Sequence, residues 1–189
     1  ESRNCSIEAT TFGDGINISI TGDAISNDGG IFAFNEGSGD ITIESYGLVS
    51  AAGNDGIYAD NEESSTASDI HINANDVTGV SGIVALNYGD GVTSIICSGT
   101  VKGANKDLGN EAVPVGIYAY NHAGATGGIS ITANNSEAYG HGIEVLDDSG
   151  NVSKIVVKGK VSGYADDSIG IKAGSSSEIT LEKTAVALG

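Results

Sequence analysis

The sequence predicts an all-β fold, a right-handed parallel β-helix of about seven coils, with roughly 26 residues and three short strands in each coil. Three observations predict this fold. A six-residue pattern, Gly-Ile-x-Ala-x-Asn, recurs at intervals of 26, 26, 34, 26 and 28 residues. A second apolar strand and then a shorter apolar step follow each copy. The apolar residues alternate as in strands, without helical periodicity, and parallel crossovers are normally right-handed.

The first strand of each coil carries the six-residue pattern. Its glycine is always followed by Ile, and Ala or Val stands two residues after the Ile. Since successive strand side chains point to opposite faces, we expect both columns to point into the coil. The last position predicts a ladder of side-chain hydrogen bonds from coil to coil. The copies begin at Gly30, Gly56, Gly82, Gly116, Gly142 and Gly170, and the ladder positions are Asn35, Asn61, Asn87, Asn121 and Asp147.

The second strand reads DITIES at Asp40 and DIHINA at Asp69, and a partial early copy of the coil begins at Gly15. The apolar positions of the third step are expected at Val49, Val77, Val101, Ala138, Val161 and Val186. We interpret residues 1–189 as a single β-helix domain. The last residues, ITLEKTAVALG, end in a strand-like run, which suggests a segment of a longer protein.

One interval is longer than the others. The 34 residues from Gly82 to Gly116 contain about eight residues more than a regular coil needs, which predicts a protruding loop at 103–113. Lys102 precedes this loop and Lys106 lies within it. Because insertions project from a solenoid and often carry binding, both lysines are candidates for contact with a partner, and the alternative is a tolerated loop with no binding role.

The outward positions of the first strands are rich in aromatic and aliphatic residues. Stacked coils would align them as a stripe along the outside of the solenoid. Exposed apolar stripes of this kind mark contact surfaces, although a neighbouring loop or another part of the chain could also cover them. The positions are Phe32, Phe34, Tyr58, Val84, Leu86, Tyr118, Tyr120 and Leu146.

The chain is strongly acidic, with a formal net charge of −17. Residues 1–101 hold 15 acidic residues and one basic residue, whereas residues 102–189 hold 10 acidic and seven basic residues. This charge argues against nucleic acid and anionic lipid as natural partners, because both need a basic surface. No apolar run approaches the roughly 18 residues of a membrane span.

No motif indicates chemistry. Some β-helix proteins cleave polysaccharides with two carboxylates that face each other across a cleft. The carboxylate pairs of this chain are instead adjacent in sequence at turns, where we expect them to be solvated. The histidines fall at different phases of the repeat, so no zinc-ligand spacing forms. We therefore predict no enzymatic activity, no cofactor and no metal site. The carboxylate pairs are Glu62-Glu63, Asp147-Asp148 and Asp166-Asp167, and the histidines are His71, His122 and His141.

Two cysteines occur, Cys5 and Cys97. Cys97 aligns with Ile72 and Ile131, which predicts a buried core thiol. Cys5 lies about three coils away, roughly 14 Å, which exceeds the Cα separation of a disulfide. We therefore expect two thiols, with Cys5 the more exposed.

The repeat Gly-Ile-aromatic-Ala-x-Asn, followed by a loop and an ITI-type strand, resembles the passenger β-helices of bacterial autotransporters (type V secretion) from Gly15 onward. Its style is most similar to long repetitive passengers of host-associated bacteria, which include adhesins and vasculoproliferative factors. The resemblance implies export and an extracellular location, either secreted or on the bacterial surface. It also implies a translocator barrel, which this sequence does not contain.

The sequence thus favours a binding module, the passenger segment of a virulence factor that contacts a host cell-surface or extracellular protein as an adhesin or a receptor ligand, including a pro-angiogenic one. Neither nucleic acid nor membrane insertion of this segment is expected. Two alternatives stay open, a polysaccharide-cleaving enzyme and a structural stalk that presents another domain.

Overall fold

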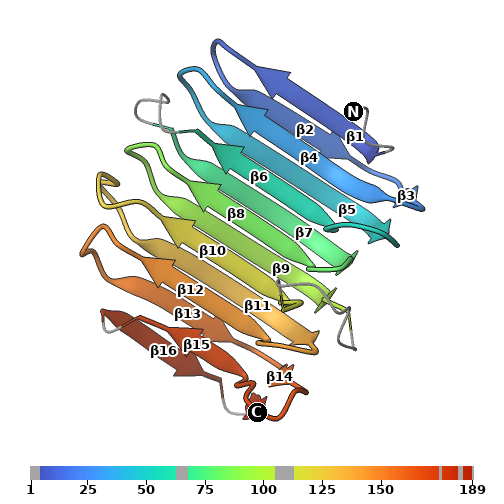
Figure 1. Cartoon of the computed structure of the whole chain (residues 1–189), viewed down its shortest axis with the longest axis vertical. Coiled ribbons are helices and arrows are strands. Elements are labelled where there is room, and N and C mark those ends of the chain that lie inside the picture. The colour runs from blue at the N-terminus through green and yellow to red at the C-terminus, as the bar shows by residue number, and fades with distance from the viewer. Residues whose placement is uncertain (1–4, 63–67, 105–112, 175, 183–184, 189) are drawn as a thin grey trace.

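The computed structural model describes residues 5–62, 68–104, 113–174, 176–182 and 185–188, and these form an all-β solenoid. All pairings between the described strands are parallel. Successive coils lie side by side in chain order, and the two ends of the chain lie at opposite ends of the stack (Figure 1). The predicted parallel β-helix is confirmed, and 26 residues separate stacked positions such as Ile31 and Ile57 in three of the six pairings of the first sheet.

The first sheet contains the six-residue pattern. Its seven strands stack in chain order, so the chain makes about six turns from the first strand to the last. Ile stacks on Ile and Ala on Ala in register, as the repeat predicts. The strands are β1 (Cys5–Thr11), β4 (Gly29–Asn35), β6 (Ile57–Asn61), β8 (Ile83–Asn87), β10 (Ile117–Asn121), β12 (Ile143–Asp147) and β15 (Ile171–Ala173).

The second sheet forms the other side of the coils. Long strands run through both the second strand and the third step, so the prediction of three short strands per coil is wrong for the middle coils. Among the described residues, separate third strands occur only toward the two ends of the stack. The long strands are β5 (Ile41–Ala51), β7 (Ile70–Thr78), β9 (Thr93–Lys102) and β11 (Ile129–Ala138); the shorter ones are β2 (Ile16–Ile20), β3 (Ala24–Ser26), β13 (Ser153–Val157), β14 (Lys160–Gly163), β16 (Ser177–Leu181) and β17 (Val186–Leu188).

The strands stay continuous because the corner between the second and third segments is a bulge in the ladder. The β5–β7 pairing shifts register between Ser45 and Leu48. At this corner Asp23 of the preceding coil accepts the backbone N–H of Leu48 at 2.8 Å. Asp76 accepts the N–H of Thr100 in the same way at 2.8 Å. A carboxylate thus replaces the missing ladder partner, and the chain bends without losing its hydrogen bonds.

Other aspartates do the same at further corners. Asp40 accepts the N–H of Asp69 at 2.9 Å, and Asp69 in turn accepts the N–H of Val92 at 2.8 Å. Aspartate suits these positions because its short side chain accepts from nearby backbone N–H groups. Part of the acidity of the chain therefore comes from side chains that join one coil to the next.

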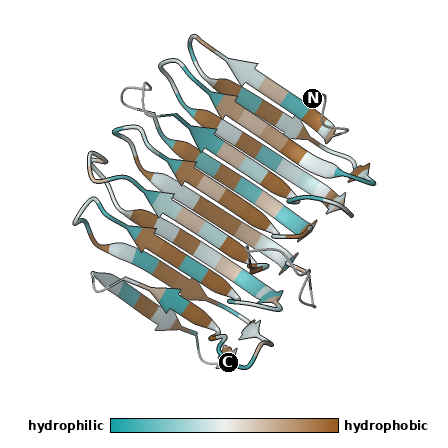
Figure 2. Cartoon of the chain, viewed as in Figure 1, coloured by the Kyte–Doolittle hydropathy of each residue, from teal (hydrophilic) through white to brown (hydrophobic). Residues whose placement is uncertain are grey.

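The interior is filled by the predicted Ile and Ala columns. Ile31, Ile57, Ile83, Ile117 and Ile143 are all 0% exposed. Apolar and polar residues alternate along the strands, as strand geometry requires when one face is buried (Figure 2). Burial of this narrow column is the main source of stability, since each coil covers its neighbours.

The predicted Asn ladder is continuous over three coils and then changes. Asn35 Nδ2 donates to Asn61 Oδ1 at 3.1 Å, and Asn61 Nδ2 donates to Asn87 Oδ1 at 3.4 Å. The next link is different, because Thr93 Oγ1 donates to Asn121 Oδ1 at 2.6 Å. All four Asn side chains are buried, and each has hydrogen-bond partners.

The third step departs from its predicted register after the middle of the stack. Val49, Val77 and Val101 stack as expected, but Ser136 takes the following position, where Ala138 was predicted. Ser136 is fully buried, and its hydroxyl donates to the carbonyl oxygen of Gly142 at 2.7 Å. In the last coil Ala187 occupies the place predicted for Val186.

Cys97 lies in the core, as predicted, but two residues away from the expected alignment. It stacks between Ala74 and Ala133, whereas Ile95 aligns with the isoleucines of the neighbouring coils. Burial raises the pKa of the Cys97 thiol to about 12. Cys5 is half-buried on β1, and the two cysteines form no disulfide with each other.

Candidate protein-binding surface

The predicted stripe lies on the outward face of the first sheet, where the register aligns it in two columns. Each strand contributes two outward residues, separated by an inward Ala or Val. We call this surface the outer face. The first column is Phe32, Tyr58, Val84, Tyr118 and Glu144, and the second is Phe34, Asp60, Leu86, Tyr120 and Leu146.

Most of these side chains are at least partly accessible, but two of the predicted positions, Phe32 and Val84, are buried. Leu146 is 43% exposed, and Tyr58, Tyr118 and Tyr120 are half-buried. Phe32, in contrast, is only 1% exposed although it lies outside the solenoid core. Its ring stacks on Tyr58 and packs over Gly29, so it supports the outer face without being available to a partner.

Aromatic rings on the outer face gather in two clusters. Tyr58 contacts both Phe32 and Phe34, with ring centroids 5.5 and 5.4 Å apart. Tyr88 contacts Tyr120 at 5.2 Å, and it also lies 6.3 Å from the ring of His122. Tyr88 and His122 were not predicted as part of this surface, because each follows the last residue of its strand, where alternation no longer predicts a side.

Carboxylates accompany the tyrosines. The Tyr58 hydroxyl donates to Asp60 Oδ2 at 3.1 Å, and the Tyr120 hydroxyl donates to Asp148 Oδ2 at 3.4 Å. Burial, and then the negative charge of Asp60, raise the pKa of Tyr58 above its ordinary value. Burial also raises the pKa of Asp60, and this outweighs the opposing effect of the Tyr58 hydrogen bond. The outer face is therefore amphipathic, with rings that present both apolar faces and carboxylate-bound hydroxyls.

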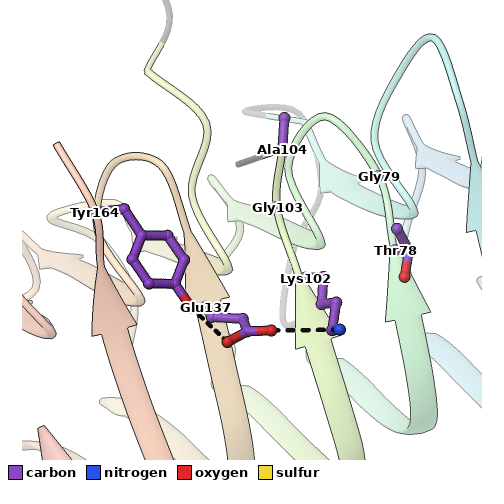
Figure 3. A pocket seen from close by; sticks show the side chains of 7 residues that line it. All are labelled: Thr78, Gly79, Lys102, Gly103, Ala104, Glu137 and Tyr164. Carbon is purple, nitrogen blue, oxygen red and sulfur yellow. Dashed lines mark hydrogen bonds and ion pairs between the residues drawn. The ribbon is translucent and has the colours of Figure 1, made fainter. Parts of the chain in front are cut away.

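Lys102 lies elsewhere, at the end of β9, where it lines a pocket at a corner of the solenoid (Figure 3). Its Nζ is 3.3 Å from Glu137 Oε1, and the Tyr164 hydroxyl donates to Glu137 Oε2. Figure 3 shows Lys102 and Tyr164 converging on this carboxylate from opposite sides. The pocket has a volume of about 540 Å³ and is also lined by Thr78, Gly79, Gly103 and Ala104.

The two sets of predicted contact residues therefore do not form one site. The aromatic candidates belong to the first sheet, whereas Lys102 belongs to the second. Lys106 and most of the predicted loop at 103–113 lie outside the described residues. Of that loop, Val113 lines a second pocket, of about 620 Å³, together with His141, Glu144, Asp166 and Lys172.

Several of the histidines and carboxylates that could serve catalysis or metal binding instead have partners within their own surroundings. His71 lies 3.4 Å from Asp69, and the ring nitrogen of His141 accepts the N–H of Ile169 at 3.2 Å. Asp147 accepts hydrogen bonds from Ser149 and Ser153. Within the part of the chain that the structure describes, no group of three His, Cys, Asp or Glu side chains could hold a metal ion.

Comparison with family models, curated proteins and solved structures finds no match to this chain. Among the described residues, no helix is long and apolar enough to cross a membrane.

Proposed function

We propose that this chain is a binding module, the β-helical passenger segment of a secreted or surface-displayed bacterial virulence factor, which contacts a host cell-surface or extracellular protein through the outer face. The proposal includes the autotransporter origin that the repeat style suggests. It gives the segment the role of an adhesin or of a receptor ligand, including a pro-angiogenic one.

The outer face is the observation that carries this proposal. It aligns accessible aromatic and aliphatic side chains over several coils, around Tyr58, Leu86, Tyr118, Tyr120 and Leu146. Tyr residues on a rigid sheet lose little conformational entropy on binding and supply a large contact area, which is why they dominate binding hot spots. A solenoid also holds its surface side chains at fixed spacing, so the face needs no rearrangement to bind.

The test is capture of surface proteins from biotinylated host cells, with the chain immobilised as bait. The matched bait carries Tyr118→Ala with Tyr120→Ala, which removes two rings of the outer face from one coil. A second bait carries Ser130→Ala with Thr132→Ala, which changes the outer side of the second sheet in the same coil. A host protein retained by the wild type and the second bait, but lost from the first, supports the proposal. Equal capture by all three baits, or by none, favours the stalk.

A further inference from the structure

We propose that the outer face recognises a basic segment of its partner, with an arginine or lysine side chain of that partner seated at Asp60 beside the Tyr58 ring. This inference rests on the proposed function, because it names the chemistry of the partner that the same face would take.

Asp60 is a carboxylate in an aromatic and aliphatic setting. In its column it lies between Phe34 and Leu86, and Tyr58 lies two residues before it on the same side of the sheet. Oδ2 accepts the Tyr58 hydroxyl at 3.1 Å, whereas Oδ1 is enclosed and accepts no hydrogen bond. No ion pair to Asp60 occurs in the described part of the chain. Asp60 is half-buried, its charge is poorly compensated, and a cation that reached the carboxylate from the solvent side would be strongly favoured.

The tyrosine beside Asp60 suits the same occupant. A guanidinium or ammonium group is attracted to the face of an aromatic ring as well as to a carboxylate. The Tyr58–Asp60 hydrogen bond holds the ring and the carboxylate together as one preorganised acceptor. Because Phe32 stacks on one face of the Tyr58 ring, the cation would meet the opposite face. The aliphatic stem of an arginine or lysine would pack on Leu86, the next residue in the Asp60 column.

A second tyrosine–carboxylate pair lies further along the outer face. The Tyr120 hydroxyl reaches Asp148, which follows β12, three strands beyond the β6 strand of Asp60. Three strand spacings are about 14 Å, and an extended chain covers this distance in about four residues. A partner segment that runs along the stack with basic residues at i and i+4 would meet both pairs.

The charge of the outer face agrees with a basic partner. The two columns contain one basic residue from β4 to β15, Lys172, and its Nζ already lies 2.6 Å from Glu144. Residues 1–101, which supply half of the stack, carry 15 acidic residues and one basic residue. An acidic surface of this kind steers basic partners toward it and disfavours acidic ones.

The test is an NMR titration of the isotope-labelled chain at physiological ionic strength with the peptide acetyl-Arg-Thr-Ser-Thr-Arg-amide. The matched peptide contains citrulline at both arginine positions, which keeps the shape and most N–H donors but removes the charge. We expect the arginine peptide to shift resonances of the outer face and to bind at least about tenfold more tightly than the citrulline peptide. Equal binding of both peptides would overturn the inference.

Two variants that each remove one negative charge distinguish a specific site from nonspecific attraction: Asp60→Asn is the test and Glu178→Gln is its control. Asp60→Asn should lower the affinity for the arginine peptide by about fivefold or more. Glu178→Gln removes one exposed carboxylate from β16 and should change that affinity by less than about twofold. Equal losses in both variants would mean that only the net charge matters, and the inference would fail. The arginine peptide could fail to bind while the Tyr118→Ala/Tyr120→Ala variant still loses capture of the host protein. That result would overturn the inference of a basic partner and would leave the proposed function standing.

Discussion

The side-chain amide of Asn35 donates a hydrogen bond to Oδ1 of Asn61 at 3.1 Å, and the two residues are 26 positions apart in sequence. This bond joins one coil to the next inside the solenoid. Asn61 also donates to the backbone carbonyl of Ser68 at 3.2 Å. One Asn per coil thus satisfies both a turn and a neighbouring coil, which explains why the repeat ends in Asn.

Replacement of Asn61 by Ala should destabilise the protein by about 2 kcal/mol, because it removes several buried hydrogen bonds and leaves a small cavity. The loss is limited because Asn35 keeps its bond to the carbonyl of Gly39, and Asn87 Oδ1 keeps the N–H of Gly89. Urea unfolding followed by circular dichroism measures the change. Asn73→Ala, on the exposed side of β7, is the matched control and should stay within about 0.5 kcal/mol of the wild type. Equal stability of the two variants would contradict the role of the ladder.

Replacement of Ile117 by Asp should cost about 4 kcal/mol or more, because it places a charge in a fully buried column. Ile117 is 0% exposed and stacks between Ile83 and Ile143. Since coils are stabilised by their neighbours, the damage should spread along the stack and increase proteolysis on both sides of β10. Ser130→Asp, on the exposed side of β11, is the control and should melt close to the wild type. A wild-type melting curve for Ile117→Asp would contradict the inward assignment.

The inward Ile and Ala columns were predictable from the sequence because the pattern that produces them is local and is repeated from coil to coil. The Gly-Ile step occurs six times with the same alternation, and alternation determines which side of the sheet each residue takes. The corner bulge was not predictable in the same way, because the Asp23–Leu48 bond joins residues 25 positions apart and gives no local pattern. The shift at Ser136 has the same origin, since a buried Ser is tolerated only where a carbonyl such as that of Gly142 lies within reach.

The positions of the outer face were predicted from the sequence, but the exposure and the contacts of their side chains were not. Alternation places Phe32 outside the core, yet it does not tell that the ring packs over Gly29 and is buried. It also gives no reason to pair Tyr120 with Asp148, which lies 28 residues later. These features depend on how side chains of different coils meet, which a single strand pattern does not contain.

Cys5 and Cys97 should titrate as about two thiols per chain in denaturant without reductant, because their separation of about three coils prevents a disulfide between them. In the native protein Cys97 should stay unreactive toward a thiol reagent at pH 8, since burial raises its pKa to about 12. Cys5 should react faster than Cys97, as its half-buried position allows. The measurement is a timed reaction with Ellman's reagent, with Cys5→Ser to assign the fast phase. Zero thiols in the denatured monomer would show that the two cysteines are bonded to each other.

The Glu137 cluster should make stability depend on pH in the acidic range. The pKa of Glu137 lies below its ordinary value, first because Tyr164 donates a hydrogen bond to it and then because Lys102 and Lys160 lie near. The folded pKa is depressed, so this stabilisation is present above the unfolded pKa of about 4.3 and is lost as pH falls through the folded pKa. Tyr164→Phe should therefore lower the free energy of unfolding at pH 7, by under about 1 kcal/mol for so exposed a cluster, and less at pH 3.5.

Urea unfolding of the wild type and of Tyr164→Phe at both pH values checks this result. Lys102→Met should behave in the same direction, because it removes the ion pair to Glu137. A difference between wild type and variant that is equal at both pH values would mean that the lost contribution is packing of the Tyr164 ring and does not involve the carboxylate charge.

Replacement of Tyr118 and Tyr120 by Ala should weaken binding of the captured host protein by about 2 kcal/mol or more, the size of a hot-spot loss. Both side chains stand on the outward side of β10, so the core columns of Ile117 and Ala119 stay intact. Surface plasmon resonance with the host protein measures the affinity, and melting temperatures run in parallel test the fold. The weaker affinity should come mainly from a faster dissociation rate, since loss of packed contacts shortens the lifetime of a complex more than it slows association.

A chain with a shortened loop around Lys106 distinguishes the contribution of the insertion to binding from that of the outer face. If lysines of the insertion steer an acidic region of the partner, the shortened chain should lose association rate, mostly at low salt, and keep its dissociation rate. Ser130→Ala with Thr132→Ala should leave both rates unchanged, because it alters the opposite sheet of the same coil. Unchanged affinity in both the double tyrosine variant and the shortened chain would remove these surfaces as the contact site. The regular stack of coils would then be better explained as a spacer, since a stalk needs rigid length and no accessible aromatic contact.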